Sequence, residues 1–341
     1  MVRVAINGFG RIGRCFLRSA WHDPEIEIVA INDLGDVKNL AYLLQYDTVY
    51  GRFSGQVSAE QGELVVGAKH IKFLSEKDPA KLPWKGLGVD IVVESTGLFT
   101  DFEKAKVHLD AGARRVVISA PAHGEHDTGE HPLGATVLVG INEERLATCT
   151  ISSNASCTTN AASPVIQILH EALGVELALL NTTHAYTASQ RIVDSPNTKD
   201  FREGRAGAQN MIPSSTGAAT AVAKAIPELK NKFDGIAVRV PVVAGSLADV
   251  TFIAARPTTV EEVNQLLEAA ARSERWQGIF TTSRDPLVSS DIVGEPYGSI
   301  ADLALTRVVG GKLVKVMAWY DNEMGYAHTL LRHVKASGKY I

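Results

Sequence analysis

The chain has 341 residues, of which 45% are hydrophobic, 21% charged and 6% aromatic, which is typical of a folded globular protein and not of a disordered or fibrous one. Its 34 Lys and Arg residues against 38 Asp and Glu residues give a net charge of −4. Charge therefore gives no indication of dedicated nucleic-acid or membrane binding. The length exceeds the roughly 250 to 300 residues at which a single core stops growing, so we expect two domains.

The first half of the chain alternates short apolar runs with helical patterns, which is typical of βαβ units and a parallel sheet. Two segments with polar–apolar alternation, 52–59 and 63–74, predict an inserted antiparallel excursion. The strands predicted for the parallel sheet are 2–6, 26–31, 89–93, 116–118 and, closing the sheet, 150–152. The predicted helices begin at Arg11 and cover 37–46 and 101–111.

The second half of the chain has a different pattern. A predicted helix at 160–173, with Pro164 near its first turn, is followed by longer strands in succession, at 175–186, 235–243, 248–255 and 313–320. Such a succession predicts a largely antiparallel sheet, with helices at 217–225 and 260–273 over one face. The polar segment 187–213 is longer than an ordinary connection, and loops of this kind are usually functional or interfacial.

A glycine motif follows the first predicted strand. Gly8, Gly10 and Gly13 form a G-x-G-x-x-G pattern at the start of a helix, and Asp33 ends the next strand 20 residues after Gly13. The glycines permit a tight turn, close approach of a pyrophosphate, and close helix packing. The pyrophosphate would bind at the N-terminus of the helix that begins at Arg11. Asp33 would accept hydrogen bonds from the adenosine ribose and repel a 2′-phosphate, which favours NAD over NADP.

The three cysteines are too few and too irregularly spaced for a disulfide framework or a metal cluster, and their odd number indicates a reducing compartment. Cys157 lies among small polar residues just before a predicted helix, whose N-terminus stabilises a thiolate, so we expect a reactive thiol with a lowered pKa. Cys15 and Cys149 are expected to be small buried hydrophobic residues. The N-terminus lacks a leader pattern and the chain lacks a long apolar run, which predicts a cytoplasmic protein without a membrane segment.

Histidines are less informative than the cysteines. His184 ends an apolar strand, a position from which a histidine can act as a general base, but the chain has ten histidines and spacing does not select this one. His123, His126 and His131 lie in a polar insert at 123–134 without supporting metal-ligand spacing. We expect a solvated loop there and no metal site.

Eight short motifs extend in order over essentially the whole chain: INGFGRIGR, AINDL, ESTGLF, SNASCTTN, HAYTASQ, NMIPSSTGAA, VRVPV and WYDNEMGY. Together they resemble the motifs of the NAD-dependent, phosphorylating glyceraldehyde-3-phosphate dehydrogenases of the glycolytic type. The resemblance implies an α/β protein with an N-terminal Rossmann domain for NAD, residues 1–156 with 322–341. A catalytic α+β domain with a largely antiparallel sheet would comprise 157–321.

The resemblance also implies a role for each matched residue. Cys157 would be the nucleophile and His184 its base. The residues that would contact NAD are Gly8, Gly10, Arg11, Ile12, Gly13, Asp33, Lys77, Ser119 and Asn322, the last holding the nicotinamide amide. The residues that would bind phosphate are Thr187 and Arg239 for the sugar phosphate, and Ser156, Thr158, Thr216 and Gly217 for inorganic phosphate. Taken alone, Thr216 and Gly217 could also be a helix N-cap and its neighbour. Arg239 could likewise be a paired structural charge.

The reaction implied is the conversion of D-glyceraldehyde 3-phosphate, phosphate and NAD to 1,3-bisphosphoglycerate and NADH through a cysteine thioester. The resemblance implies a homotetramer, with 187–213 packed against a neighbouring subunit. Two alternatives are erythrose-4-phosphate dehydrogenase, in which water is the acceptor, and a redox-sensing NAD-binding protein. Three departures from the family pattern are Ala161 in place of a frequent second cysteine, Ser189 in place of a frequent threonine, and the long insert. They leave open the oxidative behaviour of the site and details of phosphate affinity.

Overall fold

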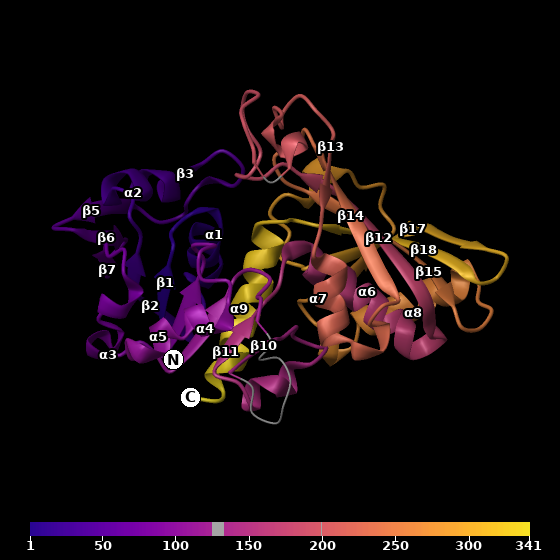
Figure 1. Ribbon diagram of the computed structural model, residues 1–341, viewed down its shortest axis with the longest axis horizontal. Helices are drawn as coiled ribbons and strands as arrows, with labels where there is room; N and C mark the ends of the chain where they lie inside the picture. The colour runs from indigo at the N-terminus through magenta and orange to yellow at the C-terminus, as the bar shows by residue number, and fades with distance from the viewer. Residues whose placement is uncertain (125–132, 199) are drawn as a thin grey trace. The chain divides into compact units, whose positions relative to one another are not determined.

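The computed structural model describes residues 1–124, 133–198 and 200–341 (Figure 1). The chain divides into two compact units, unit 1 of Met1–Ala155 with Leu330–Ile341 and unit 2 of Ser156–Thr329. The border lies inside the last helix, α9 (Met324–Gly338), whereas the division expected from the sequence falls at 322. Most of the polar insert, residues 125–132, lies outside the described residues, as does residue 199 of the segment 187–213.

Unit 1 contains, within the described residues, a nine-stranded sheet in the order β10-β11-β9-β8-β1-β2-β7-β6-β5. Pairing is parallel from β10 to β7 and antiparallel from β7 to β5. The strands are β1 (Val2–Asn7), β2 (Ile26–Asn32), β5 (Val57–Glu60), β6 (Glu63–Val66), β7 (Lys69–Leu74), β8 (Ile91–Glu94), β9 (Arg115–Ile118), β10 (Gly134–Thr136) and β11 (Ile151–Ser153), with β3 (Tyr46–Asp47) and β4 (Gly51–Arg52) as a separate pair.

This order confirms the predicted Rossmann-type sheet. From β1 the chain adds β2 on one side and later β8 and β9 on the other, so the carboxyl end of β1 is the point where a doubly wound sheet binds its ligand. The excursion was predicted as two strands, but three form, and they extend the same sheet through β7. The sheet also does not end at β11, because β10 pairs with β11 and forms the edge strand. That strand has three residues and begins with a glycine, so it carries no apolar pattern.

The helices of unit 1 mostly follow the predictions. The segment 101–111, predicted as one helix, forms two single turns that meet at Lys106. The elements are α1 (Arg11–Ala20), α2 (Val37–Gln45), α3 (Trp84–Leu87), α4 (Phe102–Ala105) and α5 (Val107–Asp110), with the 3₁₀ turns η1 (Pro79–Lys81) and η2 (Glu143–Ala147). No helix in the described ranges is long and apolar enough to cross a membrane.

Unit 2 contains, as far as the chain is described, a seven-stranded sheet in the order β13-β14-β12-β15-β18-β17-β16. Only the pairs β12–β14 and β16–β17 are parallel, which confirms a largely antiparallel sheet. The strands are β12 (Val175–Ala185), β13 (Ile212–Ser215), β14 (Phe233–Val240), β15 (Ser246–Ala254), β16 (Phe280–Ser283), β17 (Ser299–Val309) and β18 (Leu313–Tyr320). The sequence missed β13 and β16, which are short, and β17, whose register shifts between Asp302 and Arg307.

Three helices cover this sheet, namely α6 (Cys157–Leu173), α7 (Ala218–Ala225) and α8 (Val260–Ala271) (Figure 1). Along β12, buried Ala178 and Leu180 alternate with exposed Leu177 and Leu179, because successive side chains point to opposite faces. Short 3₁₀ turns complete the unit, at η3 (Phe201–Gly204), η4 (Pro227–Leu229), η5 (Glu274–Trp276) and η6 (Ser289–Ile292).

Helix α6 begins three residues earlier than predicted, at Cys157. The Ser156 hydroxyl caps the helix by accepting the Thr159 amide at 3.1 Å. As a result Pro164 lies in the helix interior and not near the first turn. The early start places Cys157 itself at the helix N-terminus.

His333, on the part of α9 that belongs to unit 1, is fully buried against β11. Its Nε2 lies 2.7 Å from the Ser152 hydroxyl and its Nδ1 lies 3.2 Å from Asn154 Oδ1. Burial, and then the positive charge of Arg115, lower the pKa of His333 to about 3. The native protein therefore holds this imidazole neutral at pH values where an exposed histidine is charged.

We predict that His333 makes stability fall as the pH falls. Between the ordinary histidine pKa of 6.5 and about 3, the unfolded chain binds a proton that native His333 does not. Unfolding therefore becomes easier by about 1.4 kcal/mol per pH unit across that window. His333→Gln removes this contribution, and chemical denaturation at a series of pH values measures the slope. An unchanged slope in the variant contradicts the prediction.

Candidate active site

In the glycine turn of unit 1, Gly8 and Gly13 are tightly packed, whereas Gly10 faces open space. Gly8 has φ +96°, and a Cβ there would lie 2.6 Å from the Thr96 amide nitrogen. A Cβ on Gly13 would lie 2.2 Å from the Gly8 carbonyl oxygen, so α1 packs on the turn only with glycine at that position. A Cβ on Gly10 would meet nothing within 4 Å. The exposed backbone at Gly10 thus fits close approach of a pyrophosphate.

Asp33 lies beside this turn and stabilises it. Its Oδ2 accepts the Phe9 amide at 2.6 Å and its Oδ1 accepts the Gly35 amide at 2.8 Å. The acid follows the carboxyl end of β2, as a ribose-binding acid in this fold does.

The start of α1 fits an anion through its backbone. Gly10, the N-cap residue, supplies no side-chain cap, and an anion at this helix start would meet the backbone amides of the first turn. The Arg11 guanidinium is engaged in an ion pair with Asp47 and stacks on the Tyr50 ring at 5.7 Å. Because this guanidinium is engaged, an anion at the helix start would meet the backbone of Arg11.

Two further cofactor candidates follow parallel strands of the same sheet. Ser119 comes directly after β9, and its amide donates to the Glu94 carbonyl oxygen at 2.9 Å. Lys77 follows β7 and is exposed. Because the carboxyl ends of parallel strands share one edge, both residues lie at the sheet edge that carries Gly8 and Asp33.

In unit 2, Cys157 and His184 are in contact. Cys157 Sγ lies 3.3 Å from His184 Nε2, which joins the first residue of α6 to the end of β12. Ala155, two residues before Cys157, has φ +54°, in the left-handed region that alanine rarely adopts. Such local strain is frequent next to functional residues.

The other nitrogen of His184 faces two competing partners. Nδ1 lies 2.6 Å from the Ala185 carbonyl oxygen and 2.6 Å from Arg239 Nη1. The parallel pairing of β12 with β14 places Arg239 directly opposite His184. A neutral imidazole either donates from Nδ1 to the carbonyl or accepts there from the guanidinium, and only the first arrangement leaves Nε2 free to take a proton from the Cys157 side.

Burial keeps both members of this pair neutral. It lowers the pKa of His184 to about 3, with the Arg239 charge acting in the same direction. It also raises the pKa of the Cys157 thiol, although Arg239 and hydrogen bonds at Thr158 act against that shift. The predicted lowering of the Cys157 pKa is therefore wrong, because removing the sulfur from water outweighs the favourable charge and helix start. Cys15 and Cys149 are buried, as predicted.

Tyr320 supports the pair and was not singled out by the sequence. Its hydroxyl bonds the hydroxyls of Thr158 and Thr182, each at 2.8 Å, and its ring packs edge-on to His184 with centroids 5.9 Å apart. Burial raises the pKa of Tyr320, so its hydroxyl stays protonated. An apolar strand that ends in a tyrosine is a common core pattern, and only the fold shows that this hydroxyl joins α6 to β12.

Ser246 connects Asn322 to the same strand and was also missed. Its hydroxyl accepts the Ala185 amide at 3.1 Å and donates to Asn322 Oδ1 at 3.0 Å. The Asn322 oxygen is thus held by Ser246, and its Nδ2 is the donor that remains on the side chain.

The phosphate candidates differ in how much of each side chain is available. The Thr158 hydroxyl is buried on Tyr320, so only the Thr158 backbone at the start of α6 can meet an anion. The Ser156 hydroxyl caps α6, and the Thr216 hydroxyl accepts the Ala218 amide at 3.2 Å at the start of α7, next to exposed Gly217. The N-cap residue of α7 is Gly217, which has no side-chain cap, and Thr216 precedes it, so an anion there would meet the N-terminus of α7.

Arg239 and Thr187 lie close to the carboxyl end of β12. Arg239 Nε is buried and finds no hydrogen-bond partner within the described part of the chain. The Thr187 hydroxyl lies 3.1 Å from the Ser189 hydroxyl and 3.2 Å from Gln190 Oε1. Ser189, the departure from the family pattern, still places a hydroxyl beside Thr187.

The doubly wound sheet with its glycine turn, and the separate unit in which a cysteine contacts a buried histidine, define a dinucleotide-dependent oxidoreductase. Residues 2–102 match the model of the glyceraldehyde 3-phosphate dehydrogenase NAD binding domain, and residues 156–322 match the model of the C-terminal domain of the same family. The chain therefore belongs to the glyceraldehyde-3-phosphate dehydrogenase family, and its cofactor is NAD.

Full-length relatives agree with this assignment. The chain is 50% identical over 334 residues to a glyceraldehyde-3-phosphate dehydrogenase of Thermotoga maritima, covering 97% of each chain. It is 48% identical over 332 residues to one of Geobacillus stearothermophilus, covering 97% of this chain and 96% of the relative. It is 47% identical over 333 residues to glyceraldehyde-3-phosphate dehydrogenase 1 of Streptomyces avermitilis, with the same coverage.

We predict that Arg239→Leu raises the pKa of His184. The substitution removes a positive charge in contact with Nδ1, and a neighbouring charge of this kind shifts a pKa by about one to three units. The measurement is an NMR titration of protein labelled in its histidine rings. Arg256→Leu is the control, since that exposed arginine pairs with Glu262 on the surface. A His184 pKa equal to that of the parent contradicts the prediction.

Proposed function

We propose that this protein oxidises D-glyceraldehyde 3-phosphate with NAD and inorganic phosphate, giving 1,3-bisphosphoglycerate and NADH. The observation that carries the proposal is the Cys157–His184 contact at 3.3 Å, with the Arg239 guanidinium against the same imidazole. A nucleophile, a base and a cation for an anionic substrate thus meet in one site.

The residues proposed to hold NAD are Gly8, Gly10, Arg11, Ile12, Gly13, Asp33, Lys77, Ser119 and Asn322. Their fit to the cofactor rests on the open backbone at Gly10, the uncapped start of α1 and the fixed carboxylate of Asp33. Bound NAD supplies an acceptor for the hydride that leaves the substrate carbon.

The chemistry of the substrate carbon belongs to Cys157 and His184. Cys157 Sγ adds to the aldehyde carbon while its proton passes to the carbonyl oxygen, which gives a hemithioacetal. His184 Nε2 then takes the hydroxyl proton as the carbon loses hydride, and a Cys157 thioester remains. Nδ1–H donation to the Ala185 carbonyl stabilises the imidazolium that this step produces.

In this proposal the substrate phosphate also acts on the base, because it binds Arg239, whose positive charge lowers the pKa of His184. Thr187 and Arg239 would hold that phosphate, and the buried Arg239 Nε offers it a donor without a protein partner in the described chain. The dianion offsets the Arg239 charge beside Nδ1, so the pKa of His184 rises toward a range useful for a base. Substrate binding and activation of His184 are thereby coupled.

Inorganic phosphate is proposed as the acceptor of the acyl group. The backbone amides at the starts of α6 and α7, with Ser156, Thr158, Thr216 and Gly217, would bind it beside the thioester. Phosphate oxygen attacks the thioester carbon, Cys157 Sγ leaves, and an acyl phosphate is released. No contact of the described residues favours a hydrolytic or a purely redox-sensing protein.

We further propose a cytoplasmic homotetramer, with NAD binding by residues 1–156 and 322–341 and catalysis by 157–321. Ile192, Val193 and Phe201, in the segment 187–213, are 88%, 71% and 85% exposed. Three exposed large apolar side chains in one segment support a subunit contact there.

Phosphate dependence tests the proposed reaction. Without phosphate, rapid mixing with aldehyde and NAD is expected to give a burst of NADH of at most about one equivalent per site, because the acyl-enzyme accumulates. Phosphate or arsenate restores turnover, and Thr216→Ala weakens that response more than it slows the burst. Sustained NADH production without phosphate, or better turnover of erythrose 4-phosphate, shows that water is the acceptor.

Cofactor preference tests the role of Asp33. We expect strong preference for NAD, because the carboxylate repels a 2′-phosphate and the neighbouring Leu34 is exposed and carries no charge. Asp33→Asn removes the charge and narrows the ratio of kcat/KM values for NAD and NADP by roughly tenfold. Asp36→Asn, which keeps a capping side chain on α2, is the control. Equal efficiency of the parent with both cofactors refutes this role.

A further inference from the structure

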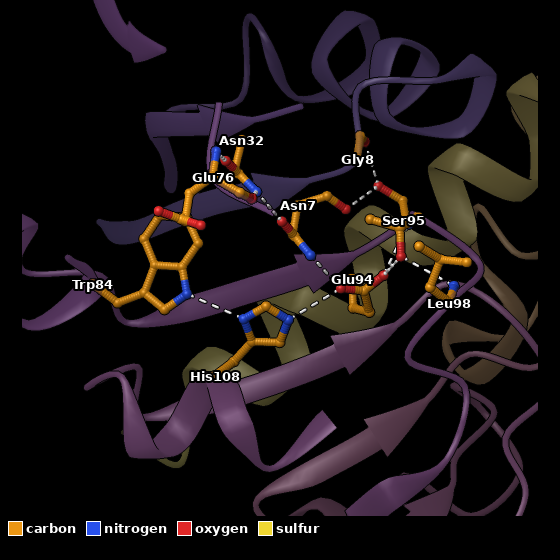
Figure 2. A network of polar contacts seen from close by, with 10 residues as sticks. Asn7, Gly8, Asn32, Glu76, Trp84, Glu94, Ser95, Leu98 and His108 are labelled. Carbon is orange, nitrogen blue, oxygen red and sulfur yellow. Dashed lines mark hydrogen bonds and ion pairs between the residues drawn. The ribbon is translucent and has the colours of Figure 1, made fainter. Parts of the chain in front are cut away.

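A chain of buried polar side chains crosses the sheet of unit 1 next to the glycine turn (Figure 2). It contains Trp84 from α3, His108 from α5, Glu94 from β8, Asn7 from β1 and Asn32 from β2. All five are 5% exposed or less. The reaction proposed above uses none of them, so their role needs another explanation.

One end of this chain of side chains determines which ring nitrogen of His108 carries the proton. The indole Nε1 of Trp84 can only donate, and it lies 3.1 Å from His108 Nδ1. Nδ1 is therefore the acceptor, and the ring carries its proton on Nε2. That Nε2–H donates to Glu94 Oε2 at 3.0 Å.

The other end fixes the orientation of both asparagines. The backbone amide of Glu76 donates to Asn32 Oδ1 at 2.9 Å, so Asn32 Nδ2 points away and donates to Asn7 Oδ1 at 2.8 Å. Asn7 Nδ2 must then donate to Glu94 Oε2, at 2.6 Å. Every hydrogen bond along the chain, from both ends, is thus directed toward Glu94.

The second oxygen of Glu94 faces the loop that follows β8. Glu94 Oε1 accepts the Thr96 amide at 2.8 Å and also the Thr96 hydroxyl, which in turn accepts the Leu98 amide at 3.0 Å. The Glu94 carboxyl group accepts four hydrogen bonds, two on each oxygen. A buried polar group with all its acceptor positions filled holds its neighbours in one arrangement.

This loop is in direct contact with the glycine turn. The Ser95 hydroxyl donates to the Gly8 carbonyl oxygen at 2.7 Å, and the Thr96 amide lies where a Cβ of Gly8 would be. The same Gly8 carbonyl is the surface on which Gly13 of α1 packs. The position of Glu94 therefore determines how the turn and the start of α1 are presented.

We propose that Glu94 is a positioning residue for NAD. Its carboxylate fixes Thr96 and Ser95, these fix the turn at Gly8, and the turn sets the affinity for the dinucleotide. This role rests on the NAD site of the function proposed above and involves no contact of Glu94 with the aldehyde.

Glu94→Gln tests the proposal, because it keeps the side-chain size and places an NH₂ group against existing donors. We expect the Kd for NADH, from fluorescence titration without aldehyde, to rise at least about tenfold, which corresponds to about 1.4 kcal/mol. In steady state the KM for NAD rises, while kcat and the KM for the aldehyde change little. A purely structural role would instead lower the active fraction, and therefore kcat, at unchanged Kd.

Asp302→Asn is the matched control. Asp302 is also a buried acid, 3% exposed, and it accepts the Trp319 indole and the Ala304 amide, each at 3.1 Å, in unit 2. We expect lower thermal stability for this variant with an unchanged Kd for NADH.

A double variant tests the direction of the hydrogen bonds. Asn7→Asp alone sets two carboxylates against each other and weakens NADH binding. Combined with Glu94→Gln, the carboxylate at position 7 accepts from the new amide and from Asn32, so the pair recovers part of the lost affinity. Strictly additive effects of the two substitutions overturn the proposed network.

Thr96→Val provides a second route if Glu94→Gln does not fold. It removes one hydroxyl at the edge of the network and is expected to raise the Kd for NADH several-fold. A parent-like Kd in the folded variants overturns the positioning role. Because the titration contains no aldehyde, a protein that binds NADH but does not oxidise glyceraldehyde 3-phosphate refutes the proposed reaction and leaves this test intact.

Discussion

The contact between Arg239 and His184 is the interaction on which the chemistry of unit 2 depends. Parallel pairing of β12 with β14 sets the guanidinium against Nδ1, and the start of α6 sets Cys157 against Nε2. Burial and the nearby positive charge hold the imidazole neutral, while burial holds the thiol neutral. An anion on Arg239 would offset the positive charge that lowers the pKa of His184.

Unit 1 uses burial of charge for a different purpose. Glu94 lies at the centre of the sheet, yet its carboxylate accepts four hydrogen bonds and so pays little for leaving water. The fixed donors at Trp84 and Glu76 leave one arrangement of the chain. A glycine turn is flexible by itself. The hydrogen bonds of this network restrain it through Ser95 and Thr96.

Both units bury polar groups, but the hydrogen bonds of these groups are satisfied to different degrees. In unit 1 all four acceptor positions of the buried Glu94 carboxyl group are filled, which gives rigidity. In unit 2 the buried Nε of Arg239 is a donor without a partner in the described chain, and His184 Nδ1 has two partners that compete for one proton position. An incompletely satisfied site is one that a ligand can complete.

The sequence alone determined the elements with strong local patterns and the glycine turn, because apolar runs, glycines and a spaced acid act over short distances. It also singled out Cys157 and, through the family motifs, His184 and Arg239, which the structure brings into contact. It placed the start of α6 too late, divided the excursion into too few strands, and gave the wrong direction for the Cys157 pKa. Those features depend on a cap at Ser156, on cross-strand pairing and on depth of burial. Only the tertiary structure decides them. It alone shows the hydrogen bonds of Tyr320, Ser246 and Glu94, because their partners are far away in the chain and no local pattern marks them.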